Sequence, residues 1–168
     1  LFEGIPDIEL VTIPDGAQEQ FDAHIKDAEA LLLSTAYKMT KEVIERAANL
    51  KVISRTGVGV DNVDVKAATE KGILVLNTPE ANSISVAEHT LALIVAISKQ
   101  LVMYDSELRT GNFAIRRTNK SADIDGKTLG LIGCGRIGRF TAEKCKAAFN
   151  MNVIGYDPYI KELPGITL

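Results

Sequence analysis

Three glycines with fixed spacing stand where an apolar run gives way to a helical stretch. Thr128–Ile132 is followed by Gly133-Cys134-Gly135-Arg136-Ile137-Gly138, the pattern G-x-G-x-x-G. In such a turn the first glycine allows the tight bend, the second lets the backbone approach a pyrophosphate, and the third lets the helix pack closely on the strand. The amides at the helix start, at Arg136 and Ile137, then face the phosphates. The motif predicts a dinucleotide-binding turn, with a purely structural glycine turn as the alternative.

An acidic residue follows this motif at the distance that ribose recognition requires. Asp157 stands 19 residues after Gly138, just beyond the second apolar run, Asn152–Gly155. Its carboxylate would accept hydrogen bonds from the ribose 2′- and 3′-hydroxyls and would repel a 2′-phosphate. The next residues, Pro158-Tyr159-Ile160, offer no arginine to receive that phosphate, so the sequence favours NAD over NADP. The Arg136 side chain either touches the pyrophosphate or is a solvated surface residue.

A second glycine turn follows the apolar residues Val52 and Ile53. Arg55-Thr56-Gly57-Val58-Gly59-Val60-Asp61 leads on to Asp64, at the start of a helical stretch. Turns at the carboxyl ends of parallel strands bind ligands in α/β folds, and successive free amides form a nest for anions. An ordinary strand-to-helix loop capped by Asp64 is an equally good interpretation of these residues.

Short apolar runs rich in Val, Ile and Leu alternate with helical stretches along the chain. Because several runs are apolar at successive positions, they predict strands covered on both faces by helices. Thr40 and Asp64 stand as N-caps before two helical stretches, and Gly72, where a positive φ is expected, ends the second. The alternation predicts an α/β fold with mostly parallel, doubly wound sheets. The expected strands are Leu10–Ile13, Ala30–Leu33, Val52–Ser54, Ile73–Leu76, Thr128–Ile132 and Asn152–Gly155.

The longest helical stretch begins near Ser85. Ser85 and Glu88 have the spacing of a capping box, and no Pro or Gly interrupts the chain from Val86 to about Leu108. Leu91–Ile97 is apolar all round, which predicts a helix buried between layers or at an interface. The following segment, Arg109–Asp125, predicts an irregular arm or a domain boundary.

Composition narrows the function classes. Lys and Arg number 19 against 22 Asp and Glu, a formal charge of −3, whereas dedicated nucleic-acid binders are usually basic. Two cysteines, Cys134 and Cys145, rule out a disulfide framework and indicate a reducing compartment. The longest apolar run has seven residues against the roughly 20 of a membrane span. We therefore expect a cytoplasmic protein that binds neither nucleic acid nor membrane.

Several blocks of the sequence, taken together, resemble the D-isomer-specific 2-hydroxyacid dehydrogenases and run in that family's order. They are Arg55–Asp64, Gly72–Pro79, Ala81-Asn82-Ser83, Val86–His89, Gly133–Gly138, and Asp157-Pro158. The resemblance implies two doubly wound parallel-sheet domains, a flavodoxin-like substrate domain and a Rossmann NAD-binding domain. It also implies an active site in the cleft between them and usually a homodimer.

The resemblance also implies where the domains lie in this chain. It assigns residues 1–77 to the substrate domain and 78–168 to the interdomain helix with the start of the NAD-binding domain. The chain opens at Leu1 without an initiator Met and without the family's first strand, and only 30 residues follow Gly138. We therefore expect both domains to be incomplete.

The family's site residues carry over position by position. The Val58 and Gly59 amides would bind the substrate carboxylate, Asn82 would lie beside nicotinamide and substrate, and Thr90 would approach the cofactor. The catalytic Arg, Glu and His of the family come from later blocks that nothing here matches, so this stretch holds no catalytic residue. His89, early in the long helix, is expected to be structural. No metal site is expected.

The resemblance implies an NAD-dependent oxidoreductase that moves a hydride between a D-2-hydroxy acid and its 2-oxo acid, such as hydroxypyruvate or glyoxylate. D-3-phosphoglycerate is an alternative substrate. Phosphoglycerate-handling members carry a basic residue where Ser34 or Thr35 stands here, which weakens that alternative. An NAD-sensing, corepressor-like interaction module is the alternative of another class, and a noncatalytic fragment is a third.

Overall fold

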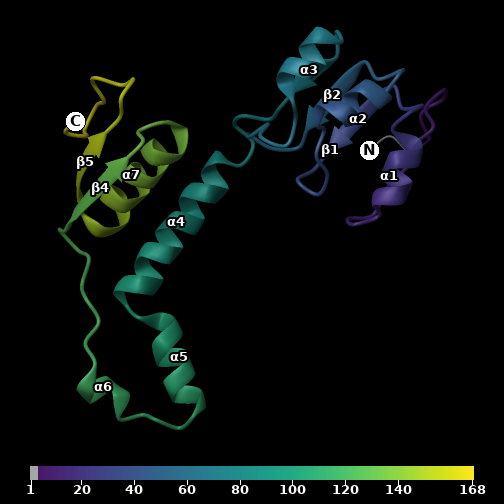
Figure 1. Cartoon of the computed structure of the whole chain (residues 1–168). Coiled ribbons are helices and arrows are strands. Elements are labelled where there is room, and N and C mark those ends of the chain that lie inside the picture. The colour runs from purple at the N-terminus through teal and green to yellow at the C-terminus, as the bar shows by residue number, and fades with distance from the viewer. Residues whose placement is uncertain (1–3) are drawn as a thin grey trace. The chain divides into compact units, whose positions relative to one another are not determined.

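The computed structural model describes residues 4–168, which form two compact units, residues 4–81 and Asn82–Leu168 (Figure 1). The division falls after Ala81, whereas the sequence placed a boundary after Asn77. Leu1–Glu3, on which the expectation of a missing beginning rested, lies outside the described residues.

The first unit is a parallel sheet whose strands are joined by helices. Its strands pair in the order β1-β2-β3, with Leu31 opposite Ile53 and Ile53 opposite Val75. The expected α/β class with parallel strands is confirmed. In chain order the elements are α1 (Gln18–His24), β1 (Ala30–Leu33), α2 (Lys41–Arg46), β2 (Val52–Arg55), α3 (Val65–Glu70) and β3 (Leu74–Leu76).

Local signals in the sequence mark the starts of α2 and α3 and the end of α3. The Thr40 hydroxyl accepts a hydrogen bond from the Val43 amide before α2, and the Asp64 carboxylate accepts one from the Ala67 amide, at 2.9 Å, before α3. Each side chain satisfies one of the free amides of a first helical turn. Gly72 has φ +74° just after α3, as its position predicts.

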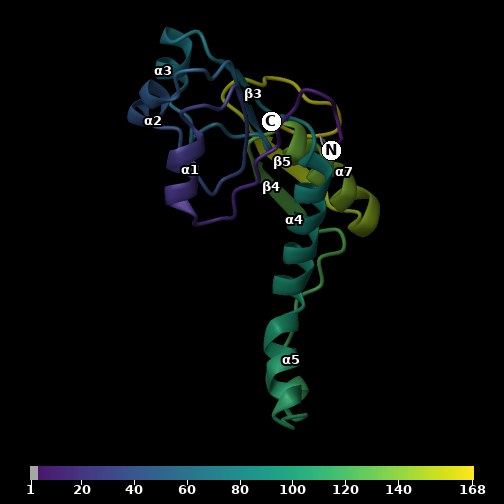
Figure 2. The ribbon, with the colours of Figure 1, turned by 90° about the vertical axis from the view of Figure 1, so that its right-hand side faces the viewer.

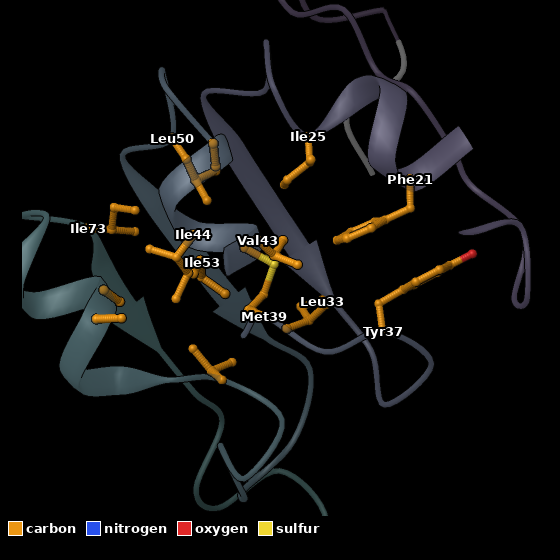
Figure 3. Packing of buried hydrophobic residues seen from close by; sticks show 14 residues of the cluster. Phe21, Ile25, Leu33, Tyr37, Met39, Val43, Ile44, Leu50, Ile53 and Ile73 are labelled. Carbon is orange, nitrogen blue, oxygen red and sulfur yellow. The ribbon is translucent and has the colours of Figure 1, made fainter. Parts of the chain in front are cut away.

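The core of the first unit lies on one face of its sheet. Figure 3 shows Phe21 and Ile25, from α1 and its end, with Val43 and Ile44 of α2 and Ile53 of β2 in one buried cluster. The expectation of helices on both faces is wrong for the described part of this unit. Since the strand order 1-2-3 always steps in one direction, right-handed crossovers place α2 and α3 on the same face. The opposite face exposes Leu32, Leu74 and Leu76.

Two elements of the first unit differ from the sequence expectation. Leu10–Ile13 was expected to be a strand, but it forms no ladder, and Leu10 and Val11 are about half exposed. An apolar run becomes a strand only when its backbone pairs with a neighbour, and this segment pairs with none in the described sheet. The helix α1 was not expected, because its seven residues bury only Phe21 and give almost no periodic pattern.

The second unit combines a parallel strand pair with several helices. β4 and β5 pair from Thr128 opposite Asn152 to Ile132 opposite Tyr156, and both α4 and β4 pack against α7. Its elements are α4 (Ser83–Ser98), α5 (Leu101–Arg109), α6 (Ile115–Thr118), β4 (Thr128–Ile132), α7 (Arg136–Phe149) and β5 (Asn152–Tyr156).

The single long helix expected from Ser85 to Leu108 is wrong. The chain forms α4 and α5, bent by 58° at a break where Gln100 takes φ +52°. The change of direction is visible in Figure 1, whereas in the view of Figure 2 the two helices follow one another almost in line. The capping box is also wrong, since α4 begins at Ser83 with Asn82 as its N-cap residue. Glu88 pairs instead with Lys144 of α7, at 3.1 Å.

The segment that returns toward β4 stabilises this break. The Ala122 amide donates to the Ser98 carbonyl at 2.8 Å, and the Gln100 side chain donates to the Lys120 carbonyl at 3.0 Å. The first of these bonds satisfies a carbonyl that a straight helix would pair internally, and the second ties the residue at the break to the returning segment. The arm predicted at Arg109–Asp125 begins at the last residue of α5 and is otherwise irregular apart from the four-residue α6.

Among the described residues no single helix is long and apolar enough to cross a membrane. Only the bent pair of α4 and α5 meets the length and composition requirement, and only when the two helices are taken together.

Candidate functional site

The glycine turn between β4 and α7 has the geometry that its spacing predicts. Gly133 has φ +93°, a backbone conformation that residues other than glycine rarely adopt. A Cβ placed on Gly138 would lie 2.4 Å from the Gly133 carbonyl oxygen, so α7 approaches the turn too closely for any side chain there. A Cβ on Gly135 would meet no atom within 4 Å, which leaves the backbone at Gly135 open to a ligand.

The start of α7 presents unpaired donors beside this open position. Gly135 is the N-cap residue and has no side chain to cap the helix. The amides of Gly135, Ile137 and Gly138 have no hydrogen-bond partner among the described residues. The 14 residues of α7 align their peptide dipoles with the positive end at this turn. An anionic group such as a pyrophosphate fits these donors and this charge.

Asp157 lies at the same turn, just after β5. Its Oδ2 accepts from the Cys134 amide at 2.8 Å, and its Oδ1 accepts from the amides of Tyr159 and Ile160 at 2.9 and 3.1 Å. The hydrogen bond from the Cys134 amide, followed by that from Tyr159, holds the pKa of Asp157 below its ordinary value. A carboxylate offers about four acceptor positions, so one acceptor position on Oδ2 remains for a ribose hydroxyl.

Two neighbours of the turn have roles that the motif alone did not assign. Cys134 is fully buried, and a Cβ on Gly155 would lie 2.7 Å from its Sγ, so Cys134 fills the space under the turn. Burial favours this packing role over a reactive thiol. The Arg139 Nε donates to the Cys134 carbonyl at 3.1 Å and adds positive charge near Asp157. Arg139 lies one turn into α7, and its contact with the Cys134 carbonyl could be recognised only from the fold.

The second glycine turn, in the first unit, is held by residues that follow β3. The Asn77 Nδ2 donates to the Val58 carbonyl at 2.7 Å, and the Thr78 amide donates to the Gly57 carbonyl at 2.9 Å. The amides of Val58 and Gly59 have no partner among the described residues. The loop therefore offers two free donors at the carboxyl edge of the sheet, as an anion nest requires.

Charged side chains flank this loop on two sides. A Cβ on Gly57 would lie 2.3 Å from a guanidinium nitrogen of Arg55, so that cation lies against the loop backbone. The Arg55 Nε is buried without a hydrogen-bond partner. Asp61 lies on the other side, 2.7 Å from where a Cβ of Gly59 would be. Arg55 was not singled out from the sequence, although its place at the end of β2 marks it.

The remaining candidate residues lie on α4 in the second unit. Asn82 makes no side-chain capping bond, so its amide group remains available to a ligand. The Thr90 hydroxyl donates to the Val86 carbonyl at 2.8 Å and keeps its acceptor capacity. The side chain of His89 is exposed and makes no hydrogen bond to the described residues, so no side-chain contact gives it the structural role expected for it.

The structure thus groups the candidates within their own units. Val58 and Gly59 lie together in the first unit. In the second unit the glycines of the turn and Asp157 lie together, with Arg136 and Ile137 exposed at the start of α7, while Asn82 and Thr90 lie along α4. No group of three or more His, Cys, Asp or Glu side chains in the described ranges could hold a metal ion.

Comparisons with known proteins agree on one family. The family model described as "D-isomer specific 2-hydroxyacid dehydrogenase, catalytic domain" matches residues 2–157. The chain is 47% identical over 160 residues to D-3-phosphoglycerate dehydrogenase of Methanocaldococcus jannaschii, covering 95% of this chain and 30% of that protein. The chain therefore spans less than a third of that curated relative.

Solved structures share the fold as well. A crystal structure of a protein from Thermus thermophilus has TM-score 0.83 and 34% identity, covering 94% of this chain and 50% of its own. D-lactate dehydrogenase from Aquifex aeolicus, solved with NAD and lactic acid, has TM-score 0.75 and 34% identity, covering 84% of this chain and 42% of its own.

Proposed function

The chain belongs to the family of D-isomer specific 2-hydroxyacid dehydrogenases, and from this premise we propose that the whole protein is an NAD-dependent oxidoreductase. It converts a D-2-hydroxy acid and its 2-oxo acid into one another. When bound, NAD accepts the hydride that leaves C2 of the hydroxy acid, or NADH returns it. The observation that carries the proposal is the turn at Gly133–Gly138 with Asp157 hydrogen-bonded to it.

The residues of that turn fit NAD. The open backbone at Gly135 and the free amides of Ile137 and Gly138 receive the pyrophosphate, with Arg136 beside them. Asp157 receives the adenosine ribose through its remaining acceptor capacity and repels a 2′-phosphate. One solved structure similar to this chain, at 31% identity, is described as an acyclic imino acid reductase in complex with NADPH, so NADP is the alternative cofactor. The carboxylate of Asp157 is our reason for preferring NAD.

The substrate carboxylate fits the free amides of Val58 and Gly59. Two adjacent N–H donors match the two oxygens of a carboxylate, and the Arg55 guanidinium adds positive charge to the same loop. Asn82, whose amide group makes no capping bond, serves the substrate and nicotinamide. Thr90 serves the cofactor. The Arg, Glu and His that orient the substrate and exchange its proton belong to the rest of the whole protein.

D-3-Phosphoglycerate is a second candidate substrate, alongside hydroxypyruvate and glyoxylate as 2-oxo acids. Proteins named D-3-phosphoglycerate dehydrogenase are 40–47% identical to this chain. Ser34 and Thr35 bring no positive charge to the end of β1, which opposes this candidate. Arg55 lies opposite Leu33 in the parallel ladder, however, and supplies a cation one residue from Ser34.

We further propose that the first unit is the substrate-binding domain and the second begins the NAD-binding domain. The protein acts in the cytoplasm as a homodimer. Exposed apolar side chains along the second half of α4 and on α5 support a dimer, since monomers rarely leave so many together. These side chains are Leu93, Ile97, Leu101, Val102 and Leu108.

An assay of the full-length protein tests the proposal. NADH oxidation is followed with hydroxypyruvate, glyoxylate, pyruvate and 3-phosphohydroxypyruvate, and NAD binding is measured by calorimetry in parallel. We expect turnover with at least one of these acids. NAD binding without turnover of any acid would contradict the enzyme and favour the NAD-sensing, corepressor-like module.

A further inference from the structure

The two loop carbonyls beside the proposed carboxylate site are both fixed by one short segment. Asn77 and Thr78 directly follow β3, which pairs with β2, so both lie at the strand ends where the loop begins. The Asn77 side chain donates a hydrogen bond to the Val58 carbonyl at 2.7 Å, and the Thr78 amide donates one to the Gly57 carbonyl at 2.9 Å.

Because the peptide bond is planar, the hydrogen bonds to the Gly57 and Val58 carbonyls also determine the directions of the Val58 and Gly59 N–H groups. In a trans peptide the carbonyl of one residue and the N–H of the next point in opposite directions. The described residues contain no cis peptide bond. Because the Gly57 carbonyl points toward Thr78, the Val58 N–H points away from it. Because the Val58 carbonyl points toward Asn77, the Gly59 N–H points away from Asn77.

We infer that Asn77 is a positioning residue that turns the Gly59 amide toward the substrate carboxylate. This inference rests on the proposed function, in which the amides of Val58 and Gly59 receive that carboxylate. Thr78 orients the Val58 amide through its own backbone N–H, which every substitution except proline retains. Asn77 orients the Gly59 amide through its side chain alone, so the second donor of the pair depends on the type of residue at this position.

No other acceptor in the described residues orients the Val58 and Gly59 amides. Neither free amide has an acceptor in the described part of the chain, although Asp61 lies close to Gly59. Without the Asn77 donor, the peptide between Val58 and Gly59 can rotate and offer its N–H to Asp61 or to water. A side chain that only stabilised the fold would have no effect confined to carboxylate binding.

Two variants of the full-length protein test the inference. Asn77→Ala removes the donor, and Asn77→Asp keeps the size but replaces the donor with an acceptor that repels both the Val58 carbonyl and an anion. Asn152→Ala is the matched control, since Asn152 is an exposed asparagine whose side chain also donates to a backbone carbonyl, that of Gly126, at the amino end of β5.

The probes are glyoxylate as substrate and oxalate as a non-reacting carboxylate, titrated by calorimetry with NAD present. For Asn77→Ala we expect the KM for glyoxylate and the Kd for oxalate to rise about 3- to 10-fold, the worth of one neutral hydrogen bond. Asn77→Asp should raise them at least as far. The kcat, the Kd for NAD and the melting temperature should stay near the wild-type values, because the lost contact is uniform binding.

Other results overturn the inference in distinguishable ways. An unchanged oxalate Kd in both variants, with oxalate bound by the wild type, removes Asn77 from this role and leaves the proposed function intact. A parallel loss of kcat, NAD affinity and melting temperature shows a general structural role instead. A wild-type protein that binds no oxalate and turns over none of hydroxypyruvate, glyoxylate, pyruvate and 3-phosphohydroxypyruvate contradicts the carboxylate site itself, and the inference with it.

Discussion

Gly138 has no room for a side chain, because its Cβ would lie 2.4 Å from a backbone oxygen of Gly133. The chain therefore needs glycine at position 138 so that α7 can pack against the turn. It needs glycine at position 135 so that a ligand can approach the backbone. We expect Gly138→Ala to push α7 away from the turn, to destabilise the protein by about 1–3 kcal/mol and to weaken NAD binding. Thermal melting and NAD titration measure the two effects.

Glu143→Ala is the control for Gly138→Ala, since Glu143 is exposed on the same helix. It should change the melting temperature little. Equal stability and equal NAD affinity for Gly138→Ala and wild type would contradict the close approach of α7 to the turn.

Asp157 connects the turn to the end of β5 and keeps acceptor capacity for a ribose. We expect Asp157→Ala to weaken NAD binding by about 10- to 100-fold, the worth of a hydrogen bond to a charged group, and to relax discrimination against NADP. Asp123→Ala is the control, because Asp123 is an exposed carboxylate whose pKa is lowered by a bond to Lys99. An unchanged preference for NAD over NADP would remove Asp157 from the ribose site.

The sequence predicts the role of a residue where that role depends only on the conformation of the neighbouring backbone. The glycine spacing, the caps at Thr40 and Asp64, and the positive φ of Gly72 are of this kind. The roles of Arg55, Asn77 and Arg139 could not be predicted, because their contacts depend on which strands or turns the fold brings together. The contact of Asn77 with the glycine loop can be recognised only once β2 and β3 are known to pair.

At the scale of elements, an apolar run alone does not decide a strand. Ala30–Leu33 and Thr128–Ile132 form strands with the expected bounds, whereas Leu10–Ile13, equally apolar, pairs with nothing described. The bend before α5 has no Pro or Gly to announce it. It depends on hydrogen bonds from residues about 20 positions later, which periodicity does not register.

The start of α3 offers a test at this scale. Asp64→Ala removes the bond to the Ala67 amide and should lower the free energy of unfolding by about 1 kcal/mol. Denaturant unfolding of the full-length protein measures it. Lys66→Ala, which loses only an exposed ion pair at 3.9 Å, should stay within about 0.5 kcal/mol of wild type. Equal effects of the two substitutions would contradict the capping role.

At the scale of the whole molecule, the exposed apolar side chains of α4 and α5 carry the expectation of a dimer. Val102 is 80% exposed, so it contributes little to its own unit. We expect Val102→Glu to shift the full-length protein from dimer to monomer, because burying an unpaired charge at an interface is costly. Analytical ultracentrifugation measures the mass. Ala148→Glu, on exposed α7 surface, should remain dimeric, and a Val102→Glu dimer as stable as wild type would place the interface elsewhere.

The handedness of the substrate is a property of the whole molecule, because the proposed function assigns the substrate carboxylate to residues of the first unit and the cofactor to residues of the second. The most direct test compares initial rates of NAD reduction by the full-length protein with the D- and L-enantiomers of one 2-hydroxy acid, for glycerate, lactate and 3-phosphoglycerate in turn. The proposed function predicts that NAD is reduced with the D-enantiomer of at least one acid and not with its L-enantiomer. Reduction with L-enantiomers alone, or none with any acid while NAD binds, would contradict it.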